Sequence, residues 1–216
     1  MNNAEVEIGT CKDIIMSSLE DAKDEIIVVS PWISEGYAKM LKQRKDEGLN
    51  VEVYTSDQME TGNHRDALKY LTSEKGGNST SRIGLLSILG ILLGLIGGNI
   101  GFFLSRPLLV IASLVVGVVS MVSLIVSRKS GVKWSPAVDH LEVYSSRLHS
   151  KIYIADEDVI ISSANFTYTG LNKNFETAIK FQDKEIREEL IEGIGDLDKR
   201  SKKKLDKIAE KARRTL

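Results

Sequence analysis

Cysteine is almost absent from this sequence, and its absence excludes two kinds of site. Cys11 is the only cysteine among 216 residues, so the chain cannot form an internal disulfide. No group of cysteine and histidine residues has the spacing of zinc ligands, so we expect neither a metal nor a cofactor. A single thiol suits a reducing compartment.

Net charge is also nearly absent, at −1, but the charge is unevenly distributed. Between Lys199 and Leu216 nine basic residues accompany two acidic ones, so positive charge belongs to the C-terminal tail. Such a tail is most often a solvated helix face, and otherwise it would lie on anionic lipid or bind nucleic acid. The first residues lack a charged lead followed by an apolar core, so we expect no cleavable signal peptide.

Charged residues are missing from two long apolar runs, 83–104 and 108–126. The first run alone would extend roughly 33 Å as a helix. The two runs predict a transmembrane helical hairpin over 81–128, with the rest of the chain in the cytoplasm because most flanking Lys and Arg residues lie on that side. Two buried helices in a soluble core are the alternative, which the lack of any polar face disfavours. We therefore expect a multi-pass protein of the cell membrane, with the lipid bilayer as a partner.

The remaining sequence predicts one α/β unit divided by this insertion. Residues 1–80 alternate helical and strand patterns, with apolar strands expected at 26–30 and 50–57. Residues 134–182 contain further strand patterns, and 183–216 is predicted to be a charged helical tail. The expected fold class is α/β, a mixed sheet flanked by helices and interrupted by the two-helix transmembrane hairpin.

One strand pattern near residue 150 carries the residues best suited to chemistry. His149 and Lys151 are two apart, so on a strand both side chains point to the same face. Ser163 and Asn165 have the same spacing. An imidazole, an ammonium, a hydroxyl and an amide that converge would supply the nucleophile, charge and donors that a phosphodiester needs. Singly, His149 is more often structural, and Ser163 and Asn165 more often close or cap a turn.

This pattern resembles the signature of the phospholipase D superfamily, which is His-x-Lys, four residues, Asp, and then Gly-Ser-x-Asn. The matching residues of this chain are His149, Lys151, Asp156, Ser163 and Asn165. The segment NFETAIKF is similar to the downstream acidic position of the superfamily and matches Glu176. Ser162 stands where glycine is usual, and the gap after Asp156 is one residue shorter than in the common pattern.

The resemblance implies a two-step, metal-free hydrolysis through a phosphohistidine formed by His149. The residues that would bind the phosphate are Lys151, Ser163 and Asn165. Lys151 and Asn165 would also take part in catalysis. Glu176 would hold the imidazole in its working tautomer, and Asp156 would orient a strand turn rather than perform chemistry.

A second histidine is required to protonate the leaving group in this scheme. The chain has one such motif, and neither His64 nor His140 begins a His-x-Lys sequence. The resemblance therefore implies a homodimer in which two copies build one shared active site.

Three functions are compatible with these features. The first is a membrane-anchored phosphodiesterase of the phospholipase D type, with phospholipid favoured because the hairpin would hold the site close to headgroups. The second is a membrane-tethered endonuclease whose basic tail would follow a nucleic-acid backbone. The third is a non-catalytic membrane scaffold that keeps the fold but has lost activity around Ser162.

Overall fold

The computed structural model describes most of the chain outside its middle. The described residues are 2–74, 89, 91, 92, 96, 99, 107–129, 134–145, 147–197 and 199–214. The chain divides into two compact units, one made of Met1–Ser73 with Trp134–Leu216 and the other of Glu74–Lys133. All candidate site residues lie in the first unit.

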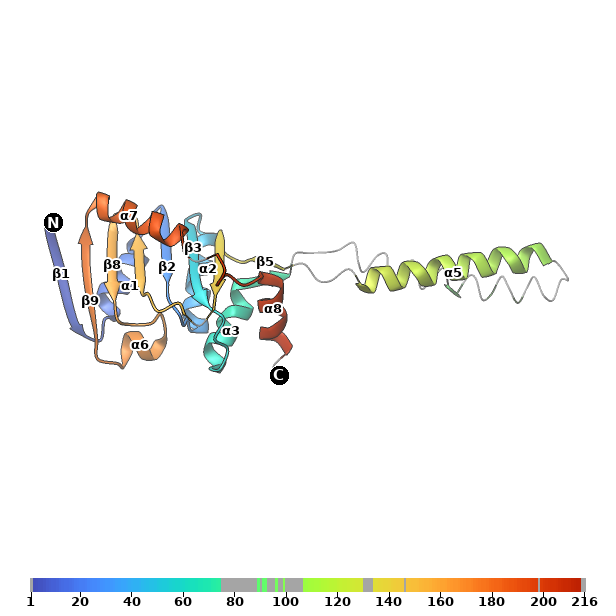
Figure 1. The fold of residues 1–216 in the computed structure, drawn as a ribbon, viewed down its shortest axis with the longest axis horizontal. Helices are drawn as coiled ribbons and strands as arrows, with labels where there is room; N and C mark the ends of the chain where they lie inside the picture. Colours follow the sequence, from blue (N-terminus) through green and yellow to red (C-terminus); the bar gives the residue numbers. More distant parts are fainter. Residues whose placement is uncertain are drawn as a thin grey trace. The chain divides into compact units, whose positions relative to one another are not determined.

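A seven-stranded mixed sheet forms the centre of the first unit (Figure 1). Its strands are β1 (Asn2–Gly9), β2 (Glu25–Val29), β3 (Asn50–Ser56), β6 (His140–Tyr144), β7 (Ile152–Ala155), β8 (Asp158–Ser162) and β9 (Glu176–Gln182). They are ordered β1-β9-β8-β7-β2-β3-β6. β2 runs parallel to β3, and β3 to β6, whereas every other neighbouring pair is antiparallel. Two further short strands, β4 (Thr72–Glu74) and β5 (Trp134–Pro136), pair with each other.

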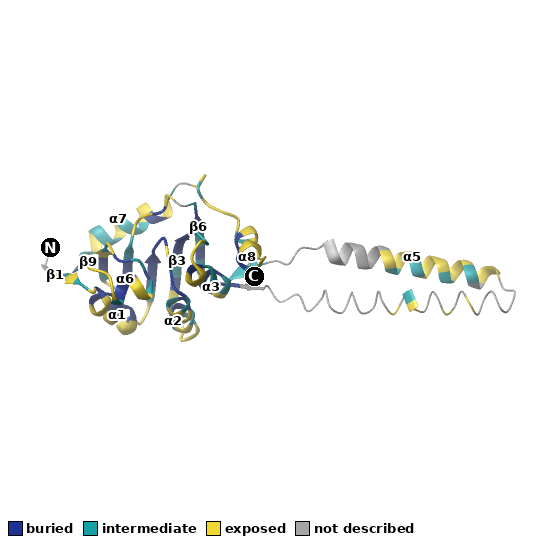
Figure 2. Cartoon of the chain, turned by 90° about the horizontal axis from the view of Figure 1, so that it is seen from below, coloured by how far each residue is buried: buried dark blue, intermediate teal, exposed yellow. Residues whose placement is uncertain are grey.

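The central strands consist of apolar side chains because both of their faces are covered. In β2 the residues from Ile26 to Val29 are all buried, and a continuous apolar run is typical of a strand enclosed on both sides. Figure 2 shows the same burial along the middle of the sheet. This enclosed centre gives a rigid base for the strand ends, where the candidate site residues lie.

Helices form a complete layer on one face of the sheet and a partial layer on the other. The helices are α1 (Lys12–Asp21), α2 (Glu35–Asp46), α3 (Gly62–Leu71), α6 (Tyr168–Asn172), α7 (Lys184–Gly195) and α8 (Leu205–Arg214). Apolar residues of α1, α2, α3 and α8 belong to one core cluster. The second cluster lies under α7, whose Leu190 and Ile194 pack with Val29 and Ile154. A single helix therefore covers this second face of the sheet.

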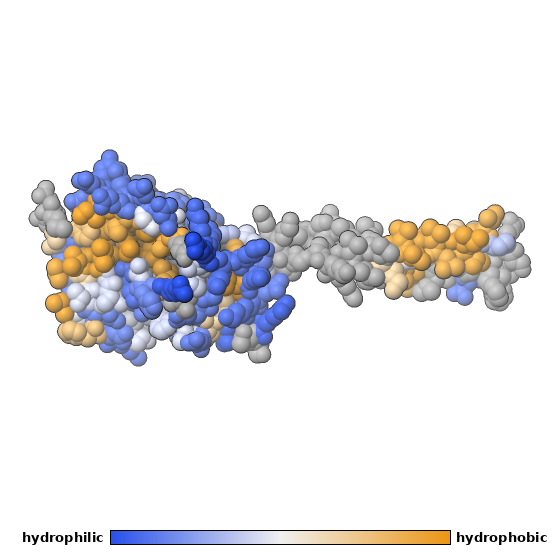
Figure 3. Space-filling model, viewed as in Figure 1, coloured by the Kyte–Doolittle hydropathy of each residue, from blue (hydrophilic) through white to orange (hydrophobic). Residues whose placement is uncertain are grey.

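Part of the face under α7 remains uncovered. Val6, Ile8, Ile161 and Ile179 are between 41% and 63% exposed, and we call them the apolar strip. Ile179 pairs with Val6 on one side and with Ile161 on the other, so the strip crosses β1, β9 and β8. Figure 3 shows apolar side chains gathered on this face beside α7.

The predicted mixed α/β sheet is confirmed, including the strands expected around β2 and β3. The sequence did not reveal β1, which pairs with β9 more than 160 positions away. The charged tail was predicted as one helical stretch, but it contains two helices, α7 and α8, with a non-helical segment between them.

The predicted transmembrane hairpin needs correction. The second unit contains α5 (Pro107–Lys129), and within 83–104 the structure describes only isolated residues. Among the described residues, no helix has both the length and the apolar character needed to cross a membrane. The predicted two-span hairpin and the multi-pass membrane location are therefore wrong.

One of the three histidines has a structural role in the first unit. His64 is 1% exposed and lies in α3. Its Nδ1 accepts a hydrogen bond from the Ile33 N–H at 3.0 Å, and its Nε2 donates to the Ser56 carbonyl oxygen at 3.0 Å. The ring thus joins the segments that follow β2 and β3. Burial lowers the pKa of His64, because the charged imidazolium would lose its hydration.

We predict that this histidine makes folding sensitive to mild acid. Because its folded-state pKa lies below the ordinary 6.5, the unfolded chain binds the extra proton first, and stability falls as the pH drops below about 6.5. His64→Gln should lower the free energy of unfolding at pH 7.5 by about 1–3 kcal/mol and flatten its pH dependence between pH 7 and 5. Urea unfolding at three pH values measures both effects, and equal pH slopes in the two proteins would contradict this account.

Candidate active site

His149 and Lys151 lie in the segment directly before β7, at one end of the sheet. His149 is exposed and Lys151 is half-buried. The Lys151 ammonium donates a hydrogen bond to the His149 carbonyl oxygen at 2.7 Å, which holds it close to the histidine backbone. We call these two residues, together with Ser163, Asn165 and Glu176, the half-site.

The end of β8 connects the parts of the half-site. The Ser162 N–H donates to the Lys151 carbonyl oxygen at 3.1 Å, and the Ser163 N–H donates to the Thr177 carbonyl oxygen at 2.9 Å. The antiparallel pairing of β8 with β7 and β9 therefore continues to the strand ends. It places Lys151 on one side of β8 and Glu176 on the other.

Ser163 and Glu176 are in direct contact. The Ser163 hydroxyl donates to Oε2 of Glu176 at 2.5 Å and accepts a bond from the Thr177 N–H at 3.0 Å. The Asn174 amide donates to Oε1 of Glu176 at 3.0 Å. Both carboxylate oxygens thus accept hydrogen bonds from residues other than His149. The orientation of the His149 ring by Glu176 stays a prediction.

Asn165 lies in the loop between β8 and α6. Hydrogen bonds hold the residues directly before and after Asn165 to the core. The Phe166 N–H donates to the Ser30 hydroxyl at 2.9 Å, and the Tyr153 hydroxyl donates to the Ala164 carbonyl oxygen at 2.7 Å. Among the described residues, the Asn165 Oδ1 is buried and has no hydrogen-bond partner. A ligand hydroxyl or N–H group would satisfy this acceptor.

The packing of α6 against this loop requires a glycine. The Thr167 hydroxyl caps α6 by accepting a hydrogen bond from the Gly170 N–H at 3.0 Å. A Cβ atom at Gly170 would lie only 2.5 Å from the Asn165 carbonyl oxygen and 3.1 Å from the Asn165 nitrogen. Gly170 therefore sets the position of the Asn165 backbone.

Asp156 lies at the opposite end of β7 from His149, in the turn between β7 and β8. Its carboxylate accepts hydrogen bonds from the backbone N–H groups of Lys23, Asp24 and Glu25 at 2.8–3.0 Å. Burial alone would raise the pKa of Asp156, but these donors hold it below the ordinary value. These contacts support the predicted role of Asp156 in orienting a strand turn.

The other two histidines have different surroundings. His64 is occupied between β2 and β3, and the His140 Nε2 lies 3.1 Å from a carboxylate oxygen of Glu142. His140 also packs beside the Tyr54 ring. The described contacts thus leave His149 as the histidine of the half-site.

Sequence reasoning missed two residues that support the half-site from inside. Cys11 is fully buried, and burial and then Glu7 raise the pKa of its thiol, while a hydrogen bond with Ser162 lowers it. Tyr153 is also fully buried, and burial raises the pKa of its hydroxyl. Cys11 directly precedes α1 and is far from Ser162 in the sequence, so no local pattern points to it, and Tyr153 was identified only as part of a strand pattern.

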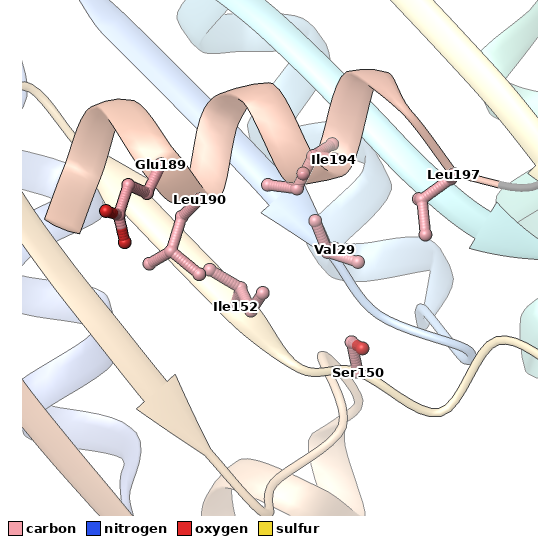
Figure 4. Close-up of a pocket in the computed structure, with 8 residues that line it drawn as sticks. Val29, Ser150, Ile152, Glu189, Leu190, Ile194 and Leu197 are labelled. Atoms are coloured by element: carbon pink, nitrogen blue, oxygen red, sulfur yellow. The ribbon is translucent and has the colours of Figure 1, made fainter.

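A small pocket opens on the α7 side of the same strand end (Figure 4). It has a volume of about 220 Å³. Its lining residues are Val29, Ser150, Ile152, Glu189, Leu190, Gly193, Ile194 and Leu197. Leu190 and Ile194 point from α7 towards the sheet, and Ser150 stands at the end of the pocket nearest the half-site segment. The walls are mostly apolar, so the pocket is not itself suited to holding a phosphate.

Comparison with known proteins gives one family match, in the part of the chain that holds the half-site. Residues 119–196 match the family described as cardiolipin synthase, PLD-like domain. No curated protein sequence is significantly similar to the chain. The matched segment contains every residue of the half-site. For this part of the chain, the match supports the phospholipase D superfamily.

Two solved structures share this fold with a TM-score of 0.50, and a third is more distantly similar. NucT from Helicobacter pylori is 11% identical, with a TM-score of 0.50 over 93% of this chain and 97% of that one. Phosphatidylserine synthase from Haemophilus influenzae is 14% identical, with a TM-score of 0.50 over 98% of this chain and 42% of that one. The phospholipase D family member Nuc from Salmonella typhimurium is 14% identical, with a TM-score of 0.46 over 93% and 97%. At such identities the likeness shows the fold alone.

We predict that Gly170→Ala displaces the Asn165 backbone, because the new methyl group would overlap the Asn165 carbonyl oxygen. The free energy of unfolding should fall by about 1–3 kcal/mol. Gly36→Ala is the matched control, since a Cβ at Gly36 meets no atom within 4 Å. Thermal unfolding of both variants tests this prediction, and equal melting temperatures would contradict it.

Proposed function

We propose that the protein is a phosphodiesterase in which the His149 imidazole attacks phosphorus. The observation that carries the proposal is the hydrogen-bonded end of β8, which gathers Lys151, Ser163 and Glu176 beside the segment of His149. The phospholipase D-like match over 119–196 supports the same chemistry. A phosphodiester at this place would meet a nucleophile, a cation and neutral donors within one small region.

The reaction would proceed in two displacements. In the first, a ring nitrogen of His149 forms a bond to phosphorus while the bond to the leaving oxygen breaks, and an acid protonates that oxygen. In the second, water attacks the phosphohistidine, gives up a proton to the same group, and the bond between nitrogen and phosphorus breaks. Lys151 and Asn165 would bind the non-bridging oxygens, whose negative charge increases in each transition state.

The acid of the first step would come from a second copy of the chain. The half-site contains one histidine, and His64 and His140 are bonded elsewhere. The apolar strip offers a surface for the second copy, because its four side chains are exposed on a face that α7 covers only in part. We infer a two-fold homodimer in which each imidazole faces the other across one phosphate.

The substrate class depends on features outside the half-site. The preference for phospholipid rested on the transmembrane hairpin and is lost with that prediction. Both a phospholipid and a nucleic acid present the same diester group to His149. A small chromogenic diester therefore tests the proposed chemistry without deciding between them.

His149→Ala should abolish hydrolysis of bis(4-nitrophenyl) phosphate in the presence of EDTA, with a loss on the order of 10³-fold or more. The reason is that the imidazole is both nucleophile and, in the second copy, acid. His140→Ala is the matched control, because His140 is also partly exposed but lies beside Glu142. Release of 4-nitrophenol measures the rate, and a His149→Ala protein as active as the control would refute the proposal.

Mixing the active chain with His149→Ala chains tests the shared site. If one site needs both imidazoles, an equal mixture after subunit exchange should retain about one quarter of the activity, rather than about half. Co-refolding the two chains in varied ratios gives the full curve. A linear dependence on the active fraction would show that each chain works alone.

A further inference from the structure

Positive charge gathers in one exposed segment between α7 and α8, residues 199–204, which we call the basic strap (Figure 1). Its exposed basic side chains are Lys199, Arg200, Lys202, Lys203 and Lys204. The next part of the tail has a different role, since α8 buries Ile208 and Ala212, and Arg213 donates to the carbonyl oxygens of Lys69 and Thr72. Packing therefore explains α8 but not the basic strap, in which Lys202 pairs with Glu142.

Backbone hydrogen bonds hold the basic strap beside the end of β6. The Lys203 N–H donates to the Val143 carbonyl oxygen at 2.7 Å, and the Ser145 N–H donates to the Ser201 carbonyl oxygen at 2.9 Å. The bridge between Tyr144 and Lys202 is antiparallel. The basic strap thus runs along the end of β6, from which the chain continues to His149.

Arg147 extends the charge towards the half-site. It is exposed and stands two residues before His149, and the buried Leu148 between them anchors this segment in the core under α7. His149 follows Ser145 by four positions, so their Cα atoms are at most about 14 Å apart. A ligand that touches both the basic strap and the half-site must carry negative charge over a comparable length.

Exposed aromatic rings lie near the opposite side of the half-site. Phe175, directly before Glu176, is 84% exposed, and Tyr168 at the start of α6 is 57% exposed. The Lys173 ammonium lies 5.5 Å from the centre of the Tyr168 ring. Exposed rings interleaved with cations are typical of surfaces on which unpaired bases stack.

We propose that the basic strap and Arg147 bind the phosphates of a single-stranded nucleic acid whose scissile diester lies at the half-site. This inference rests on the proposed function. A separation of at most about 14 Å is within the reach of a few nucleotides, so one strand spans both places. Most phospholipids carry a single diester, and one such molecule at His149 leaves the basic strap without a ligand. Phe175 and Tyr168 offer stacking faces to the bases on the other side.

The test measures binding by the full chain with His149→Ala in every protein, so that it does not depend on hydrolysis. The probe is a fluorescent single-stranded oligonucleotide of about 20 nucleotides, followed by anisotropy. Arg147→Glu/Lys203→Glu should raise the dissociation constant about tenfold or more and reduce the slope of log K against log salt by about 1.4, or 0.7 per contact. The matched control is Lys23→Glu/Lys184→Glu, which makes the same change of charge at the opposite end of the sheet.

Two results would overturn the inference. One is equal weakening by both double variants, because only overall charge would then matter. The other is unchanged oligonucleotide binding by Arg147→Glu/Lys203→Glu together with lost binding to vesicles that contain anionic phospholipid. Phe175→Ala should separately weaken oligonucleotide binding at least about fivefold. If the protein did not hydrolyse the diester but still bound the oligonucleotide through the basic strap, the proposed catalytic function would be refuted and the proposed binding surface would stand.

Discussion

The hydrogen bonds at the end of β8 are the constraint on which the half-site depends. Ser162 is bonded in three directions: its N–H donates to Lys151, its hydroxyl donates to Thr177, and the same hydroxyl accepts from the Ala164 N–H. The residue that replaces the usual glycine of the superfamily signature is therefore used structurally. Its hydroxyl ties β8 to β9 where the two strands separate, so the substitution is accommodated without a break in the strand pairing.

The unequal covering of the two faces of the sheet has a physical cause. On one face, apolar residues of α1, α2, α3 and α8 join a single core, whereas α7 alone packs against the other face. An apolar strip of four half-exposed side chains costs solvation free energy in an isolated chain, about 25 cal/mol for each Å² of apolar surface left in water. Association through this face would recover that energy, and it would do so beside the half-site that lacks a second histidine.

Local sequence patterns were sufficient where neighbouring residues determine the structure. The apolar run of β2 identified an enclosed strand, whereas the nucleophilic role of His149 is implied by the family resemblance and stays a prediction. The contact of Ser163 with Glu176 could not be predicted as a hydrogen bond, because it depends on the register between β8 and β9. The structural role of the buried His64 could not be predicted either, because both of its hydrogen-bond partners come from other segments. The hairpin prediction is wrong, because no described helix has the length and apolar character needed to cross a membrane.

The exposure of the His149 ring indicates what a second copy would add to the half-site in the proposed dimer. Its imidazole is exposed, and both oxygens of Glu176 accept hydrogen bonds from Ser163 and Asn174. Water screens the charges around an exposed ring, so Lys151 and Asn165 would stabilise a developing phosphorane only weakly. A surface that covers the ring would remove this water and strengthen each interaction. In the proposed dimer the second copy supplies that cover together with the missing acid, so catalysis and assembly would depend on the same face of the sheet.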